Sequence, residues 1–95
     1  MQAGVLAAGL DGIENKRDPG KPVHLNMYEE GHKVKGAKHL PATLHDALRL
    51  FEKSKILREG LGAELMDAYI KLKMQEWGDY TSHLSEWERR HTMDC

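Results

Sequence analysis

Ninety-five residues provide at most one small domain, and a chain of this size buries only about 60–65% of the surface that it exposes when unfolded. The 14 basic and 15 acidic residues nearly cancel and are spread along the chain, so no basic stripe indicates nucleic-acid binding. One Phe, two Trp and three Tyr make a thin aromatic core, which fits a piece of a larger domain at least as well as a complete one.

The ends of the sequence predict a cytoplasmic chain. The apolar start, residues 1–10, has no basic flank, and Asp11 ends it after about half the length of a membrane span. The single cysteine, Cys95, excludes an internal disulfide framework and fits a reducing compartment. We expect neither a membrane anchor nor a signal peptide.

Residues 2–15 are predicted to form the first helix. Val5, Leu6, Leu10 and Ile13 supply bulky apolar positions among alanines and glycines. Since a glycine costs about 1 kcal/mol in a helix interior, the glycines suggest that close packing requires small residues. We therefore expect a short buried helix.

A long loop is predicted to follow, at about residues 17–40. Proline disfavours helical geometry in the residue before it, so the helix ends before Pro19, and Asp18-Pro19-Gly20 is a turn signal. No helical period appears from Lys21 to Lys38. Loops of this length inside a domain are commonly functional or disordered.

The rest of the chain is predicted to be helical, which gives a mostly α fold with three to four short helices. Thr43 caps a helix with an apolar face over residues 44–51, and a turn or second helical piece follows up to Gly62. The next helix runs from about Ala63 to Glu76 or Trp77, with an expected i,i+4 pair between Asp67 and Lys71. Residues 79–81 are interpreted as a break, and Ser85 with Glu88 forms a capping box that opens a terminal helix to about Arg90.

No catalytic or metal site can be argued from the residues themselves. Six histidines are present, of which His24, His32 and His39 share the predicted loop, but none of the six has the i,i+4 spacing of a helical metal site. Solvated loop histidines are the simpler interpretation. The serines lie at helix starts or turns, where capping explains them, and no carboxylate pair lies in an apolar setting.

Four collinear blocks resemble the C-terminal part of the glutamine synthetase catalytic domain. The string AAGLDGIENK from Ala7, followed by the turn and by Asn26-Met27-Tyr28, is similar to a family helix that leads into an Asn-Leu-Tyr loop. The start LPATLHDAL at Leu40, the helix DAYIKLK at Asp67 and the closing WERRH at Trp87 resemble the blocks that follow. The last of these looks more like the ending of members that act on amines or other non-ammonia substrates, such as those of the gamma-glutamyl-amine ligase type.

This resemblance implies that residues 1–95 are an incomplete domain, a fragment of the α+β glutamine synthetase catalytic domain. It implies a parent enzyme of nitrogen metabolism that uses ATP, with Mg or Mn, to activate glutamate as an acyl phosphate for attack by ammonia or an amine. The family's metal and phosphate ligands precede the segment resembled here, so no catalytic, cofactor-binding or metal residue is carried over, and we expect the chain to be inactive alone. Its implied partners are the remainder of the ligase domain and neighbouring subunits of a ring oligomer.

The resemblance marks Tyr28 as a candidate regulatory modification site. Tyr28 matches the tyrosine of the Asn-Leu-Tyr loop that is adenylylated in some bacterial glutamine synthetases. The sequence then departs from the family, because Glu29-Glu30-Gly31-His32 replaces the Asp-Leu-Pro-type sequence of the regulated enzymes. The alternative is a loop tyrosine that packs on a neighbouring surface with its hydroxyl hydrogen-bonded.

Two other functions fit the same residues. The chain could be a free-standing helical interaction module that presents the apolar faces of residues 44–51 and 65–77 to a partner. A metal binder built on the loop histidines is the third. A module would unfold cooperatively as a monomer or defined dimer, whereas a fragment would associate heterogeneously through its exposed apolar faces.

Overall fold

The protein is described by a computed structural model over residues 1–93, so Cys95 lies outside the described part. Those residues form six α-helices, one 3-10 helix and no strand, which confirms the predicted mostly helical fold. In chain order the elements are α1 (Gln2–Glu14), α2 (Met27–Glu30), the 3-10 helix η1 (Gly31–Lys33), α3 (Leu44–Lys53), α4 (Lys55–Leu61), α5 (Ala63–Ser82) and α6 (Glu86–Thr92).

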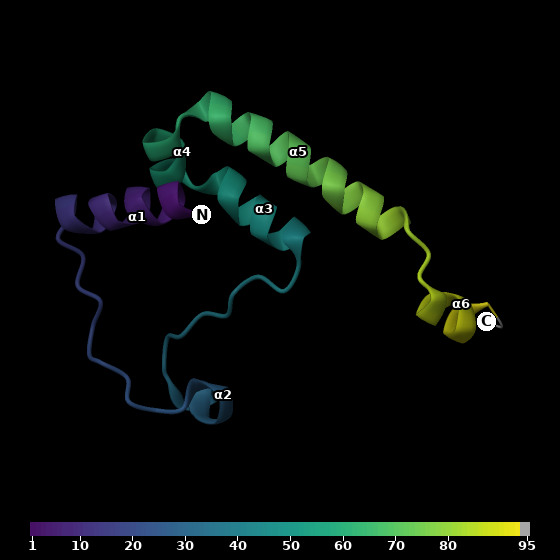
Figure 1. The fold of residues 1–95 in the computed structure, drawn as a ribbon. Coiled ribbons are helices and arrows are strands. Elements are labelled where there is room, and N and C mark those ends of the chain that lie inside the picture. The colour runs from purple at the N-terminus through teal and green to yellow at the C-terminus, as the bar shows by residue number, and fades with distance from the viewer. Residues whose placement is uncertain (94–95) are drawn as a thin grey trace.

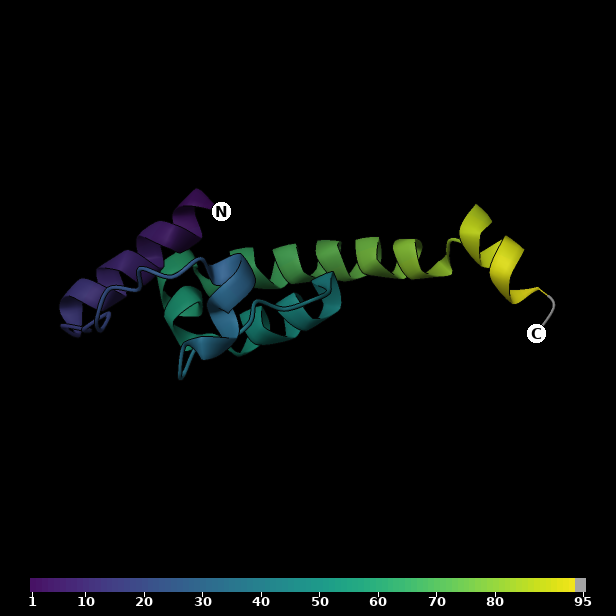
Figure 2. The same ribbon diagram turned by 90° about the horizontal axis from the view of Figure 1, so that it is seen from below.

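The helices form an open, flat arrangement (Figures 1 and 2). The extents are 56 × 40 × 19 Å and the radius of gyration is 18.4 Å, whereas a compact domain of about 100 residues has a radius of about 13 Å. α1 packs on α4, α3 packs on α5, and α4 contacts α5. The short α2 lies apart from the other helices, at the far end of the segment between α1 and α3 (residues 15–43), which we call the excursion (Figure 1). α6 lies beyond the far end of α5 (Figure 1).

The core is formed where α3 and α5 lie side by side. Leu48 of α3 is 4% exposed and Met66 of α5 is fully buried, and these are the buried side chains of residues 1–93. Beside them, the rings of Phe51 and Tyr69 meet edge to face with centroids 5.8 Å apart. The interaction-module hypothesis assigned the apolar faces of residues 44–51 and 65–77 to a partner. In the structure, parts of these two faces pack against each other.

α1 was predicted to be buried, and that prediction is wrong for this chain. None of its residues is buried, and Val5, Leu6 and Ile13 are each more than half exposed. The reason is that α4, the helix on which it mainly packs, is only seven residues long and covers one side of it.

Close packing of small residues occurs at one point of the α1–α4 contact. A Cβ added to Gly60 of α4 would lie 2.7 Å from the Cβ of Ala7, so the two helices can approach only because residue 60 has no side chain. The glycines of α1 do not make such contacts: Gly9 and Gly12 have open space around the Cβ position.

The links between α3, α4 and α5 are capped by side chains, as expected for helix starts in this sequence. Thr43 Oγ1 accepts a hydrogen bond from the Asp46 amide at 3.2 Å, which confirms the predicted cap of α3. Ser54 caps α4 in the same way, and Gly62, with φ of 91°, joins α4 to α5. The expected pair between Asp67 and Lys71 is replaced by one between Asp67 and Arg58, at 3.1 Å, which ties α5 to α4.

α5 is longer than predicted, because the expected break at residues 79–81 does not occur. The helix continues through Ser82. Thr81 and Ser82 each donate a hydroxyl hydrogen bond to carbonyl oxygens of the preceding turn, Trp77 and Gly78, at 2.8–3.1 Å. Thr and Ser often end a helix, but here their hydroxyl groups form hydrogen bonds within the helix and the helix continues.

α6 begins with the predicted capping box. Ser85 Oγ accepts from the Glu88 amide, and Glu88 Oε2 accepts from both the amide and the hydroxyl of Ser85, each at 2.8 Å. These two hydrogen bonds hold the pKa of Glu88 below its usual value. The bond from the Ser85 backbone contributes most, and the bond from its hydroxyl contributes less.

The lowered pKa of Glu88 makes the start of α6 sensitive to acid. A carboxylate with a lowered pKa in the folded helix contributes stability that is present above its unfolded pKa and lost as pH falls through the folded value. We therefore expect the Ser85 amide proton shift, followed by NMR, to stay constant on acidification to the usual glutamate range and to change below it. Glu88→Gln should abolish this transition and Glu86→Gln should leave it in place; a transition that persists in Glu88→Gln would contradict the assignment.

Candidate functional site

The segment Asn26-Met27-Tyr28 forms the start of α2, at the far end of the excursion between α1 and α3. Asn26 is the N-cap, and its Oδ1 accepts a hydrogen bond from the Tyr28 amide at 3.2 Å. The acidic residues Glu29 and Glu30 occupy the first turn, where they favour a helix N-terminus. This small helix was not predicted, although an Asn followed by two acidic residues is a recognisable start signal.

Tyr28 is fully exposed, with a relative accessibility of 102%. Within residues 1–93 its ring packs on no other ring and its hydroxyl has no hydrogen-bond partner. The tyrosine thus does not pack on a surface of the described chain. Its role as a modification site stays a prediction.

The excursion that carries Tyr28 is held by contacts along its own chain. Asp18 Oδ1 accepts from the Gly20 amide at 2.9 Å, which closes the predicted turn, and Lys33 pairs with Glu30 at 2.5 Å. α2 packs on η1. These short-range contacts fix the local conformation of the tip and leave its side chains open to solvent.

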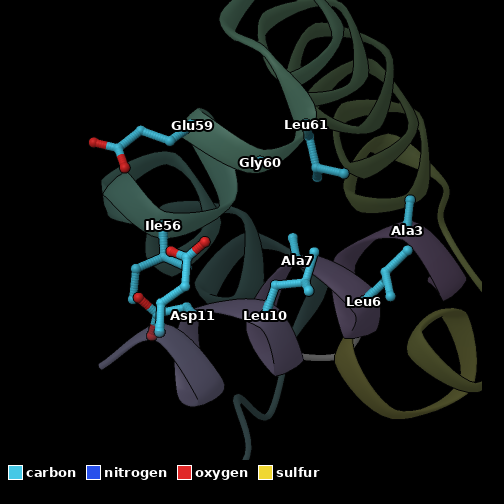
Figure 3. A pocket seen from close by; sticks show the side chains of 10 residues that line it. Ala3, Leu6, Ala7, Leu10, Asp11, Ile56, Glu59, Gly60 and Leu61 are labelled. Carbon is cyan, nitrogen blue, oxygen red and sulfur yellow. The ribbon is translucent and has the colours of Figure 1, made fainter. Parts of the chain in front are cut away.

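A hollow of about 380 Å³ lies between α1 and α4 (Figure 3). Leu6, Ala7 and Leu10 line one side of it, and Ile56, Gly60 and Leu61 line the other. Asp11, Glu14 and Glu59 bring carboxylates to its edge, and Asp11 is paired with Arg17 at 2.7 Å and bonded by Asn15. The close contact between Ala7 and Gly60 forms part of its wall. Among its lining residues no nucleophile lies beside a general base.

The loop histidines are exposed and are not brought together. Among residues 1–93 no group of three or more His, Cys, Asp or Glu side chains could hold a metal ion. Two other histidines stack on tryptophans, His45 on Trp77 with centroids 5.9 Å apart and His91 on Trp87 at 4.3 Å. Packing accounts for these two rings.

The electrostatics of the described residues do not single out an acid–base site. The groups with shifted pKa values are Lys73 and Glu88, and each shift has a partner on or next to its own helix. A hydrogen bond from Lys73 to Glu76 at 2.6 Å raises the pKa of Lys73. Perturbed pKa values mark catalytic groups when they occur in a cleft with a reacting partner, and neither group lies in such a setting.

None of the helices of the described chain is long and apolar enough to cross a membrane.

The sequence is similar to glutamine synthetases over its whole length. The glutamine synthetase of Rhizobium leguminosarum bv. phaseoli is 49% identical over 94 residues, and that of Rhizobium meliloti is 47% identical over 94; both matches cover 99% of this chain and 22% of the relative. The glutamate–methylamine ligase of Methyloversatilis universalis is 43% identical over 89 residues, covering 90% of this chain and 20% of the relative. The chain thus spans about a fifth of the length of the curated relatives that it matches.

The family itself is given by a match of residues 1–92 to the sequence model of the glutamine synthetase catalytic domain. This match covers α1 to α6 and includes the excursion with Tyr28. It agrees with the four blocks from which the resemblance was first drawn. The chain therefore belongs to the glutamine synthetase family and corresponds to a part of its catalytic domain.

Proposed function

We propose that this chain is the C-terminal part of an ATP-dependent carboxylate–amine ligase that joins ammonia or an amine to glutamate through an acyl phosphate. The observation that carries the proposal is the match of residues 1–92 to the glutamine synthetase catalytic domain. The relatives at 49% and 43% identity, a glutamine synthetase and a glutamate–methylamine ligase, support a ligase that attaches nitrogen to glutamate.

In this proposal the chemistry lies in the remainder of the ligase. Residues 1–93 offer no cluster that fits a divalent cation, and no nucleophile lies beside a base in the hollow between α1 and α4. ATP and Mg²⁺ or Mn²⁺ would be held by the rest of the parent chain, in the cytoplasm. In this proposal the present chain is inactive alone.

Its contribution is a helical wall and a projecting loop. Many large apolar side chains remain exposed on α1 and α5, which supports a role in packing against other parts of the ligase and against neighbouring subunits of a ring. Tyr28 projects from the loop without a partner in the described chain and is well placed to be adenylylated by another enzyme.

The experiment that tests this function is a segment exchange. In the chimaera, the matching segment of the R. leguminosarum glutamine synthetase is replaced by the part of this chain that aligns with it, which is 49% identical over 94 residues. We expect the chimaera to release phosphate from ATP in the presence of glutamate and ammonia or methylamine. The isolated 95-residue chain should release none above the blank.

The two outcomes have separate meanings. An inactive chimaera with an unfolded catalytic domain would remove the proposed function, since a family segment should substitute for its counterpart. Ligase activity in the isolated chain would instead place the chemistry within these 95 residues. Comparing ammonia with methylamine as the nitrogen donor tests which of the two relatives the segment resembles in specificity.

A further inference from the structure

An apolar hollow of about 360 Å³ opens where α1, α3, α4 and α5 meet. The two buried residues, Leu48 and Met66, line it, together with Phe51 of α3 and with Leu65 and Tyr69 of α5. Since these residues come from distant parts of the sequence, the hollow exists only in the assembled fold.

The wall of this hollow is predominantly apolar. No lining side chain carries a charge, in contrast to the hollow between α1 and α4, where Asp11, Glu14 and Glu59 lie. Within residues 1–93 no buried side-chain nitrogen or oxygen lacks a hydrogen-bond partner. A small polar substrate would need several placed polar groups to orient it, whereas the lining residues offer, besides the peptide backbone, the Tyr69 hydroxyl and the α-amino group of Met1. An apolar surface of a macromolecule is the occupant that this chemistry fits.

The rim of the hollow continues as an uncovered apolar ridge along α5. Leu65, Tyr69 and Leu72 follow one another at spacings of four and three, so they lie on one side of the helix. They are 57%, 47% and 61% exposed. Lys71 and Gln75 are exposed polar residues of the same helix that do not belong to this ridge.

We propose that the remainder of the ligase polypeptide covers this hollow and ridge with an apolar surface of its own. The proposal rests on the proposed function and names the face that makes the contact. The matched relatives are about five times longer than this chain, so most of the family's chain lies outside the structure and is available as the occupant. The radius of gyration of 18.4 Å, well above the value for a compact domain, is consistent with a face that is completed by other residues.

The test measures coverage directly, by thiol labelling of cysteines introduced into a Cys95→Ser background. Leu65→Cys reports on the ridge and Gln75→Cys on an exposed polar position of the same helix outside the ridge. Each is labelled in the isolated chain and in the chimaera, and the modified peptide is identified by mass spectrometry. We expect labelling at residue 65 to be at least about tenfold slower in the chimaera than in the isolated chain, and labelling at residue 75 to differ less than about threefold.

The outcomes separate this proposal from the proposed function. Equal labelling rates at residue 65 in an active chimaera would overturn the docking surface and leave the ligase assignment in place. An inactive, unfolded chimaera would overturn both. Protection of residue 65 in the isolated chain that increases with concentration would show that a second copy of the chain is the occupant, which would also overturn the proposal.

Discussion

Replacing Met66 with alanine is expected to lower the free energy of unfolding of the chain by about 2–5 kcal/mol, the cost of removing a buried methionine side chain and leaving a cavity. Met66 is the one fully buried residue of the described chain, and Leu48 is the only other buried one. Because so little else is buried in the described chain, this loss should be a large part of its total stability. Urea unfolding of the 95-residue chain, followed by far-UV circular dichroism, measures it.

Met74 provides a matched control, since it is the same residue type on the same helix and is 40% exposed. Met74→Ala should change the free energy of unfolding by about 0.5 kcal/mol or less, as for most surface substitutions. Equal shifts for the two alanine variants would mean that the contact between α3 and α5 is not the core of the chain in solution.

The second large effect is expected at the contact between α1 and α4. Gly60→Ala places a Cβ 2.7 Å from the Cβ of Ala7, closer than two such atoms can approach, so the helices must separate. Overpacking of this kind costs about 1–3 kcal/mol. The same substitution at Gly78 of α5, where nothing lies within 4 Å of the new Cβ, should instead stabilise the helix by about 0.5–1 kcal/mol.

A double-mutant cycle isolates the contact between the two small residues. Ala7→Gly removes the atom with which the new methyl group of Gly60→Ala collides, so the double variant should be more stable than the sum of the two single changes implies. Urea unfolding of the four proteins gives the coupling free energy. Additive effects would show that α1 is not held against α4 at this point.

Local signals in the sequence were sufficient to predict most helix starts. Thr43 caps α3 and Ser85 caps α6, as predicted. An N-cap can be predicted because it depends on a few neighbouring residues and not on the rest of the fold. The apolar spacing over residues 44–51 likewise identified the side of α3 that carries Leu48. The family resemblance rested on strings of similar residues and was confirmed over residues 1–92.

The features that could not be predicted depend on contacts across the chain. Nothing in the spacing of Ala7 and Gly60 indicates that they meet, and the expected burial of α1 required a neighbour that these residues do not provide. The break expected near Tyr80 does not occur, because the hydroxyl groups of Thr81 and Ser82 donate hydrogen bonds to carbonyl oxygens of the same helix. Whether a hydroxyl bonds in this way depends on its side-chain rotamer, which the sequence does not give. Asn26 belongs to the tripeptide that carries the family resemblance, and in the structure it also caps α2, which the absence of a helical period after it did not indicate.

The excursion between α1 and α3 has a consequence for how the segment can vary among relatives. Its ends are fixed because α1 packs on α4, α3 packs on α5, and α4 contacts α5. Its middle, α2 with η1, is stabilised by short-range contacts of its own. The entropy of closing a flexible loop grows only with the logarithm of its length, at about 0.6 kcal/mol for each doubling. Residues can therefore be gained or lost on either side of α2 with little effect on the pairing of α1 with α4, and the reach of Tyr28 can evolve independently of the core.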